Sequence, residues 1–218
     1  IAGQGTVGME IASLAPDVVL VPIGGGGLAA GVALALHAQG VRIVGAQVEH
    51  VDAMHRVVRG EPEGAPPVAT LADGVRVRHP GVLTREILSR LLDDIVIVRE
   101  AELRETLVRL ALEEHVIAEG AGALALAAGR RVAGKRKCAI VSGGNIDAAV
   151  LAGLLADVRP RAPRKPRRRA HEDAIAKPAS RAGRVTALSP VVARPVPPAT
   201  TSNAAHSTAT VSALEAFA

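Results

Sequence analysis

Four consecutive glycines, at residues 24–27, follow the apolar run VVLV at residues 18–21 and precede an alanine-rich segment that begins at Leu28. Glycine has no Cβ, so it adopts positive φ and lets a ligand approach the backbone closely. A strand, a glycine loop and a helix N-terminus in this order direct several backbone N–H groups at one point, which suits a phosphate. The stretch GGGGL therefore predicts a phosphate-binding cradle that works through its backbone and carries no catalytic side chain.

A second glycine turn, SGGN at residues 142–145, follows the apolar segment at residues 137–141. The hydroxyl of Ser142 can donate a hydrogen bond to a ligand, although a serine in such a turn also serves to start a helix. Cys138 lies inside the preceding segment, where we expect a buried, unreactive thiol. The seven histidines are scattered without the spacing of metal ligands, so we expect no metal site.

The elements that must position these loops alternate between strand-like and helix-like patterns. Strands are expected at residues 18–21, 41–47, 95–98 and 137–141. Helices are expected at residues 6–14, 28–39, 52–59, 83–92, 100–114, 119–132 and 146–158, with Thr84 as an N-cap. Apolar runs separated by helical stretches favour an α/β fold, a parallel sheet flanked by helices. Ligands of such sheets bind at the carboxyl ends of the strands, where both glycine loops fall.

Composition divides the chain into an α/β domain over residues 1–158 and a basic tail over residues 159–218. The tail holds 11 basic and 3 acidic residues, a net charge of +8, and 8 of the 14 prolines. Such a composition buries little surface, so we expect the tail to be disordered. The domain carries 15 basic and 18 acidic residues, a net charge of −3, so nucleic-acid binding is conceivable for the tail alone.

The rest of the composition excludes several classes of protein. No stretch of 18 apolar residues occurs, so we expect no membrane span, and no signal peptide is evident. A single cysteine, Cys138, forms no internal disulfide and is consistent with the cytoplasm. The chain begins at Ile1, which reads like the middle of a protein, so we expect an upstream part.

Three motifs now occur in order: GGGGL at residues 24–28, AEGAGA at residues 118–123 and SGGNID at residues 142–147. The segments GQGT at 3–6, VGAQ at 44–47 and ADGV at 72–75 accompany them. The series resembles the pyridoxal-phosphate-dependent threonine dehydratases (threonine ammonia-lyases), which belong to the tryptophan synthase β-like enzymes of fold type II. The resemblance covers residues 1 to about 158 and implies an incomplete large domain of that fold.

The resemblance assigns the phosphate of pyridoxal 5′-phosphate to the backbone N–H groups of five residues: Gly24, Gly25, Gly26, Gly27 and Leu28. It assigns to Ser142 a hydrogen bond to the pyridine nitrogen. A hydroxyl, unlike a carboxylate, does not keep that nitrogen protonated, so the ring is a weaker electron sink and prompt β-elimination is favoured. The implied reaction converts L-threonine or L-serine to a 2-oxo acid and ammonia, as in isoleucine biosynthesis, in an enzyme that is a homo-oligomer.

Other residues of the series receive plainer interpretations. Glu119 begins the alanine-rich segment, where an acidic residue in the first helical turn complements the helix dipole. Asp73 and Gly74 are expected in a loop.

In the family that this series resembles, the Schiff-base lysine lies upstream of the GQGT segment. We therefore expect no catalytic residue in this chain and no activity from the chain alone. Lys135 and Lys137 precede a strand, so they should lie at its amino end, away from the cofactor. Lys165 and Lys177 fall in the tail.

Three alternatives stay open. Serine racemases share the GGGG loop and the SGGN turn, but an acidic residue that helps them bind a divalent metal corresponds to Gln47 here. A non-catalytic remnant that binds a phosphorylated ligand would use the same glycine loop. A Rossmann dinucleotide site would need G-x-G-x-x-G and a later acidic residue, which residues 25–31 and Glu49 imitate in part.

Overall fold

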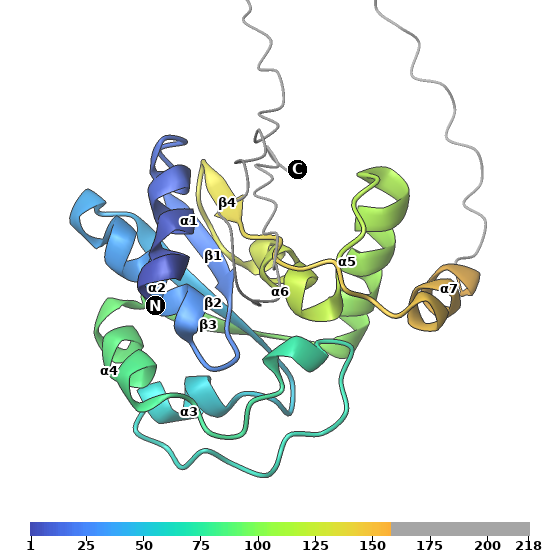
Figure 1. The fold of residues 1–218 in the computed structure, drawn as a ribbon, viewed down its shortest axis with the longest axis horizontal. Coiled ribbons are helices and arrows are strands. Elements are labelled where there is room, and N and C mark those ends of the chain that lie inside the picture. Colours follow the sequence, from blue (N-terminus) through green and yellow to red (C-terminus); the bar gives the residue numbers. More distant parts are fainter. Residues whose placement is uncertain (158–218) are drawn as a thin grey trace, which may run out of the picture. The chain divides into compact units, whose positions relative to one another are not determined.

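The computed structural model describes residues 1–157, so the predicted tail at 159–218 lies outside the described residues. Four strands form one parallel sheet in the order β3-β2-β1-β4, as Figure 1 shows. They span Val18–Pro22 (β1), Arg42–Val48 (β2), Asp94–Val98 (β3) and Lys137–Ala139 (β4). The predicted α/β class with a parallel sheet is confirmed.

Seven α-helices are found in the described part of the chain, near each of the predicted positions. They span Ala2–Ala12 (α1), Gly27–Leu36 (α2), Ala53–Val58 (α3), Val82–Leu91 (α4), Glu100–Glu113 (α5), Gly120–Ala128 (α6) and Ala148–Ala156 (α7). Three 3₁₀ turns accompany them, at His37–Gln39 (η1), Asp73–Val75 (η2) and Gly129–Arg131 (η3).

Two details at the starts of helices differ from the prediction. Helix α1 begins four residues earlier than expected and includes the GQGT segment, although glycine weakens a helix. The helix packs along α2. The predicted N-cap Thr84 is wrong, because α4 is capped at Gly81 without a side-chain bond. The hydroxyl of Thr84 instead donates to backbone carbonyl oxygens, one of them in the glycine loop.

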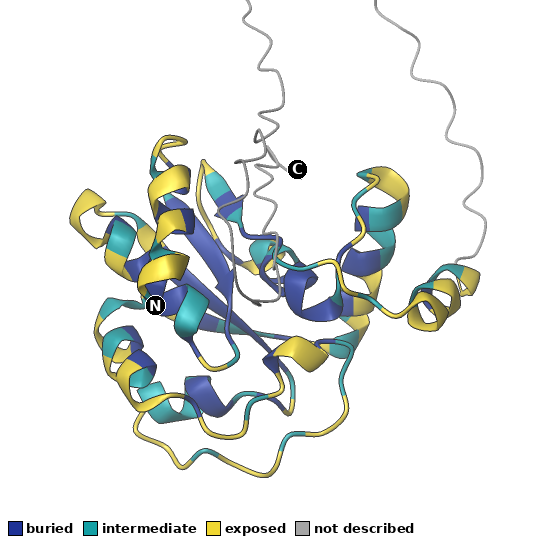
Figure 2. Ribbon diagram, viewed as in Figure 1, coloured by how far each residue is buried: buried dark blue, intermediate teal, exposed yellow. Residues whose placement is uncertain are grey.

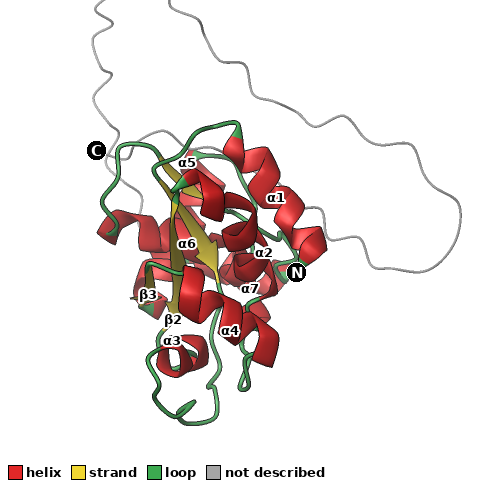
Figure 3. Ribbon diagram, turned by 90° about the vertical axis from the view of Figure 1, so that its left-hand side faces the viewer, coloured by secondary structure: helices red, strands yellow, loops and turns green. Residues whose placement is uncertain are grey.

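Strand β1 is buried along its whole length (Figure 2). Its sequence is apolar without alternation, because both faces of the sheet are covered. Val18 and Leu20 belong to one apolar core, and Val19 and Val21 belong to the other. The first core is closed by α5, α6 and one residue of α7, Leu154. The second is closed by α1 to α4, so helices lie on both sides of the strands (Figure 3).

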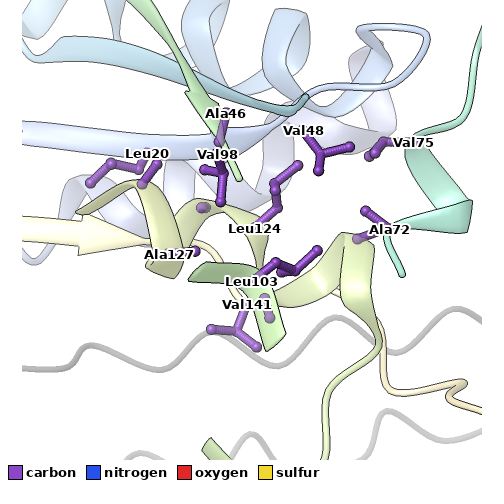
Figure 4. Close-up of a cluster of buried hydrophobic side chains, with 14 of the residues drawn as sticks. Leu20, Ala46, Val48, Ala72, Val75, Val98, Leu103, Leu124, Ala127 and Val141 are labelled. Carbon is purple, nitrogen blue, oxygen red and sulfur yellow. The ribbon is translucent and has the colours of Figure 1, made fainter. Parts of the chain in front are cut away.

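Helix α6 lies close to the sheet because its residues are small. Eight of its nine residues are buried. Figure 4 shows Leu124 of α6 near Val48 and Val98, with Leu20 and Ala127 in the same cluster. The small side chains of α6 thus let the helix pack closely against the sheet.

The path of the chain brings the two glycine loops together. The strands run outward from β1 to β2 to β3, and the chain then returns so that β4 pairs with the other side of β1. After β1 the chain enters α2 on one face, whereas after β4 it leads to α7, which packs against α5 on the other. Neighbouring strands whose connections leave to opposite faces create a crevice at their carboxyl ends, which is where α/β proteins bind ligands.

No helix in residues 1–157 has the length and apolar character that crossing a bilayer requires.

Candidate functional site

The glycine loop joins β1 to α2 and presents free backbone donors. Gly26 is the N-cap of α2 with a φ of 90°, and no side chain caps this helix. Among the described residues, the backbone N–H groups of residues 24–28 have no protein acceptor. A Cβ on Gly25 or Gly27 would meet only open space. Several unpaired donors at the positive end of a helix dipole suit an anion.

The loop is held in place from behind by neighbouring elements. Ile23 donates its N–H to Ala46 O at 2.9 Å, and its carbonyl oxygen accepts from Gln47 Nε2 at 3.2 Å. The carbonyl oxygen of Gly25 accepts from Thr84 Oγ1 of α4 at 2.6 Å. These bonds use the carbonyl side of the loop and leave its N–H groups unused.

Ser142 lies on the opposite side of the crevice, after β4. Its N–H donates to Gly122 O of α6 at 3.3 Å, and its hydroxyl has no bonding partner among residues 1–157. Ser142 does not start a helix, because α7 begins at Ala148 and is capped by Asp147, whose Oδ1 accepts from Ala149 N at 2.7 Å. The Ser142 hydroxyl is therefore available to a ligand.

A cavity of about 300 Å³ lies between the two loops. Gly27 and Leu28 line it from one side and Ser142 from the other, while Gln4 of the GQGT segment also contributes. The structure thus brings three of the six predicted site residues to one cavity. The other three, Gly24, Gly25 and Gly26, belong to the same loop but do not line it. The volume lies at the lower end of the range for small-molecule sites.

Glu119 also lines this cavity, which the sequence did not predict. It is the N-cap of α6, and a Cβ on Gly143, whose φ is 88°, would collide with the Glu119 carboxylate. Burial, and then the negative charge of Asp73, raise the pKa of the Glu119 carboxyl. The motif AEGAGA could have indicated this position, since glycine and alanine leave room for the one long side chain among them.

The lysines of the described residues lie at the other end of the sheet. Lys137 pairs with Val18 at the start of both strands, and its Nζ donates to Gly129 O at 3.0 Å. Lys135 precedes it by two residues. Both therefore lie at the amino end of β4, as the sequence predicts.

Three further residues singled out in the sequence are buried or engaged by the protein. Cys138 is buried, and burial raises the pKa of its thiol. The carboxylate of Glu49 accepts the N–H of Glu100 at 2.9 Å, so it caps the start of α5. Gln47 is buried with both halves of its amide bonded. In residues 1–157, no group of three metal-ligating side chains occurs.

Comparison with known families gives this site a context. A family model described as "Pyridoxal-phosphate dependent enzyme" matches residues 1–143. The chain belongs to the pyridoxal-phosphate dependent enzymes. Pyridoxal phosphate, the cofactor of this family, carries a phosphate and a pyridine nitrogen. The unpaired N–H groups of the glycine loop and the unbonded Ser142 hydroxyl are of the right chemistry for these two groups.

Two curated relatives are similar to this member of the family over about two thirds of its length. The L-threonine ammonia-lyase of Thermotoga maritima is 43% identical over 155 residues, which cover 67% of this chain and 39% of the relative. The catabolic L-threonine dehydratase TdcB of Escherichia coli K12 is 45% identical over 158 residues, covering 67% of this chain and 48% of the relative. The chain thus spans less than half the length of these two relatives.

Solved structures agree with this placement in the family. The threonine deaminase isoform 2 of Solanum lycopersicum, in its processed form, superposes with a TM-score of 0.65 at 31% identity, over 72% of this chain and 49% of that one. Maize serine racemase superposes with a TM-score of 0.63 at 32% identity, over 71% and 52%. These two similarities confirm the expected type of fold.

Proposed function

We propose that this chain is the cofactor-binding part of a threonine dehydratase, with residues 1–158 forming its α/β domain. The enzyme would convert L-threonine or L-serine to a 2-oxo acid and ammonia. One observation carries the proposal: unpaired N–H groups of the glycine loop and the free hydroxyl of Ser142 border one cavity at the carboxyl ends of β1 and β4. The names of the two curated relatives support the choice of reaction.

The glycine loop and Ser142 each have a role in this proposal. The N–H groups of Gly24, Gly25, Gly26, Gly27 and Leu28 bind the phosphate, and the dipole of α2 adds to their attraction. Ser142 donates to the pyridine nitrogen and orients the ring. When bound, the cofactor supplies an electron sink for the amino acid. Because a hydroxyl carries no charge, it would not hold a proton on the nitrogen, so the bound cofactor would be a weaker electron sink, which favours elimination.

Three broader assignments belong to the same proposal. The single cysteine supports a cytoplasmic enzyme. The E. coli relative is named catabolic, which supports breakdown of threonine rather than isoleucine biosynthesis. We further propose that the whole enzyme is a homo-oligomer.

Binding of pyridoxamine 5′-phosphate tests the cofactor site directly. This compound has the phosphate and the ring but an amine in place of the aldehyde, so it forms no covalent bond with a lysine. Calorimetric titration of the 218-residue chain should show saturable binding at one site, and Ser142→Ala should weaken it by about threefold to tenfold. A chain that is folded and binds no pyridoxamine 5′-phosphate contradicts the proposal.

The reaction is tested in a chimera. Residues 1–158 are joined to the N-terminal part of E. coli TdcB, and formation of 2-oxobutyrate from L-threonine is measured. We expect turnover by the chimera and none by the 218-residue chain, whose described lysines lie at the far end of the sheet. A chimera that binds the cofactor and converts neither L-threonine nor L-serine contradicts the assignment as a dehydratase.

Racemisation of serine is a second candidate, supported by the similarity to maize serine racemase. The metal-binding acidic residue expected of such enzymes corresponds here to Gln47, a neutral side chain whose Nε2 and Oε1 are hydrogen-bonded to Ile23 and His55. The same chimera distinguishes the two activities, because a racemase would form D-serine from L-serine.

A further inference from the structure

The hydroxyl of Thr84 reaches the glycine loop from a distant part of the sequence. Its Oγ1 donates to the carbonyl oxygen of Gly25 at 2.6 Å, across 59 positions of the chain. Thr84 lies in the first turn of α4 and is buried, with 9% of its surface exposed. The N–H of Gly81 approaches the same oxygen at 3.4 Å, which is a weaker contact.

This bond fixes more than a carbonyl group. The peptide unit is planar and trans, so the C=O of Gly25 and the N–H of Gly26 point in opposite directions. Holding the oxygen toward α4 therefore directs the N–H of Gly26 away from α4. That N–H has no acceptor among the described residues.

The packing behind Gly26 points the same way. A Cβ on Gly26 would lie 2.8 Å from Met54 Cε, 2.9 Å from Thr84 Cβ and 3.0 Å from Leu88 Cδ1. The loop thus rests directly on α3 and α4. Thr84 provides both a surface for Gly26 and the hydrogen bond that sets the orientation of the peptide.

We propose that Thr84 is a positioning residue for phosphate binding, whose hydroxyl keeps the N–H of Gly26 available to the phosphate of the cofactor. The inference rests on the proposed function and adds a residue outside the glycine loop to it. A threonine with a purely local role would bond only within its own helix, as Thr106 does: Thr106 Oγ1 donates to Glu102 O at 2.8 Å. Thr84 has such a bond too, to Gly81 O at 2.9 Å, but its single proton has the shorter contact with Gly25.

A series of substitutions at position 84 tests this role. Thr84→Val keeps the shape and removes the hydroxyl, Thr84→Ser keeps the hydroxyl, and Thr84→Cys offers a weak donor. Thr106→Val is the matched control, since it removes a buried hydroxyl of the same kind from α5. Each 218-residue variant is titrated with pyridoxamine 5′-phosphate by calorimetry, and the ³¹P NMR signal of the bound ligand is recorded in the complex. The thermal midpoint of each variant is measured without ligand.

We expect Thr84→Val to weaken binding about tenfold and to shift the ³¹P signal of the bound phosphate. Thr84→Ser should stay within about twofold of the unsubstituted chain, Thr84→Cys should fall between the two, and Thr106→Val should bind normally. If Thr84→Val does not fold, the affinities of the other two variants still test the donor, because Thr84→Ser should bind pyridoxamine 5′-phosphate more tightly than Thr84→Cys.

Three results would overturn the inference: unchanged binding by both Thr84→Val and Thr84→Cys, equal loss in the Ser and Cys variants, or a loss in Thr106→Val as large as in Thr84→Val. In each case the unsubstituted chain still binds, so the proposed function stands. If the unsubstituted chain itself binds no pyridoxamine 5′-phosphate, the proposed function fails first and the positioning role fails with it.

Discussion

The side chain of Gln47 bonds to the carbonyl oxygen of Ile23, the residue that leads from β1 into the glycine loop. Gln47 Nε2 donates to Ile23 O at 3.2 Å, and Gln47 Oε1 accepts the N–H of His55 at 2.8 Å. One buried amide thus links the end of β2 to the loop and to α3. A carboxylate could not do this, because it has no donor for the carbonyl oxygen of Ile23.

Removal of this amide should destabilise the fold. Gln47→Leu leaves a buried carbonyl oxygen and a buried N–H without partners, and we expect a loss of about 2 kcal/mol in the free energy of unfolding. Urea unfolding measures it. Gln39→Leu, at an exposed position, is the control and should change the value by less than about 0.5 kcal/mol. Equal stability of the Gln47 and Gln39 variants would show that the bridge contributes nothing.

Divalent cations should not stabilise the protein. Both polar atoms of Gln47 are hydrogen-bonded to protein, and its amide carries no negative charge to attract a metal ion. A ligand that binds the folded state raises its thermal midpoint, so we expect no rise of the midpoint with Mg²⁺ and no fall after metal is removed by a chelator. Thermal unfolding by circular dichroism is the measurement, and a midpoint that climbs by several degrees with Mg²⁺ would refute the expectation.

Gly26 should tolerate no side chain. Its φ of 90° is unfavourable for other residues, and a Cβ there would collide with Met54, Thr84 and Leu88. We expect Gly26→Ala to cost about 2–3 kcal/mol of stability and to weaken binding of pyridoxamine 5′-phosphate. Gly25→Ala is the matched control for stability, because its Cβ enters open space and should cost less than about 1 kcal/mol. Urea unfolding compares the two, and similar losses would contradict the packing described here.

Glu102 should make the stability depend on pH. Hydrogen bonds from the side chain and the backbone of Arg99, and then the hydrogen bond and charge of Arg131, hold the pKa of Glu102 at about 2, below its ordinary value of 4.5. A carboxyl with a lowered pKa stabilises the folded state above pH 4.5, and this contribution is lost as the pH falls toward about 2. The partners are partly exposed, so we expect Glu102→Gln to lower stability at pH 7 by only about 1 kcal/mol.

The matching measurement is urea unfolding of Glu102→Gln and of the unsubstituted chain at pH 7 and pH 3. The difference should shrink at the lower pH, because Glu102 of the unfolded state takes up a proton below pH 4.5 while the folded state still resists protonation. A difference of the same size at both values would mean that Glu102 acts through packing and not through its charge.

Local patterns in the sequence predict the elements of this fold and the loops that carry its chemistry. Four apolar runs, separated by helical segments, predict the parallel sheet. The pattern of a strand and the pattern of a helix are each visible within a few neighbouring residues. The position of GGGGL and SGGN after two of these runs predicts that both lie at the carboxyl edge. The position of Lys135 and Lys137 before a run predicts, for the same reason, that they lie at the opposite edge.

The tertiary structure alone decided which residues meet at that edge. Residues 24–28 and Ser142 lie more than one hundred positions apart, and only the strand order β3-β2-β1-β4 places their strands side by side. The partners of Thr84 and Gln47 and the surroundings of Glu119 likewise come from elements distant in the chain. A periodic pattern records which face of an element is buried, but it carries no information about the element that covers this face. That choice is made by packing, which involves the whole domain at once.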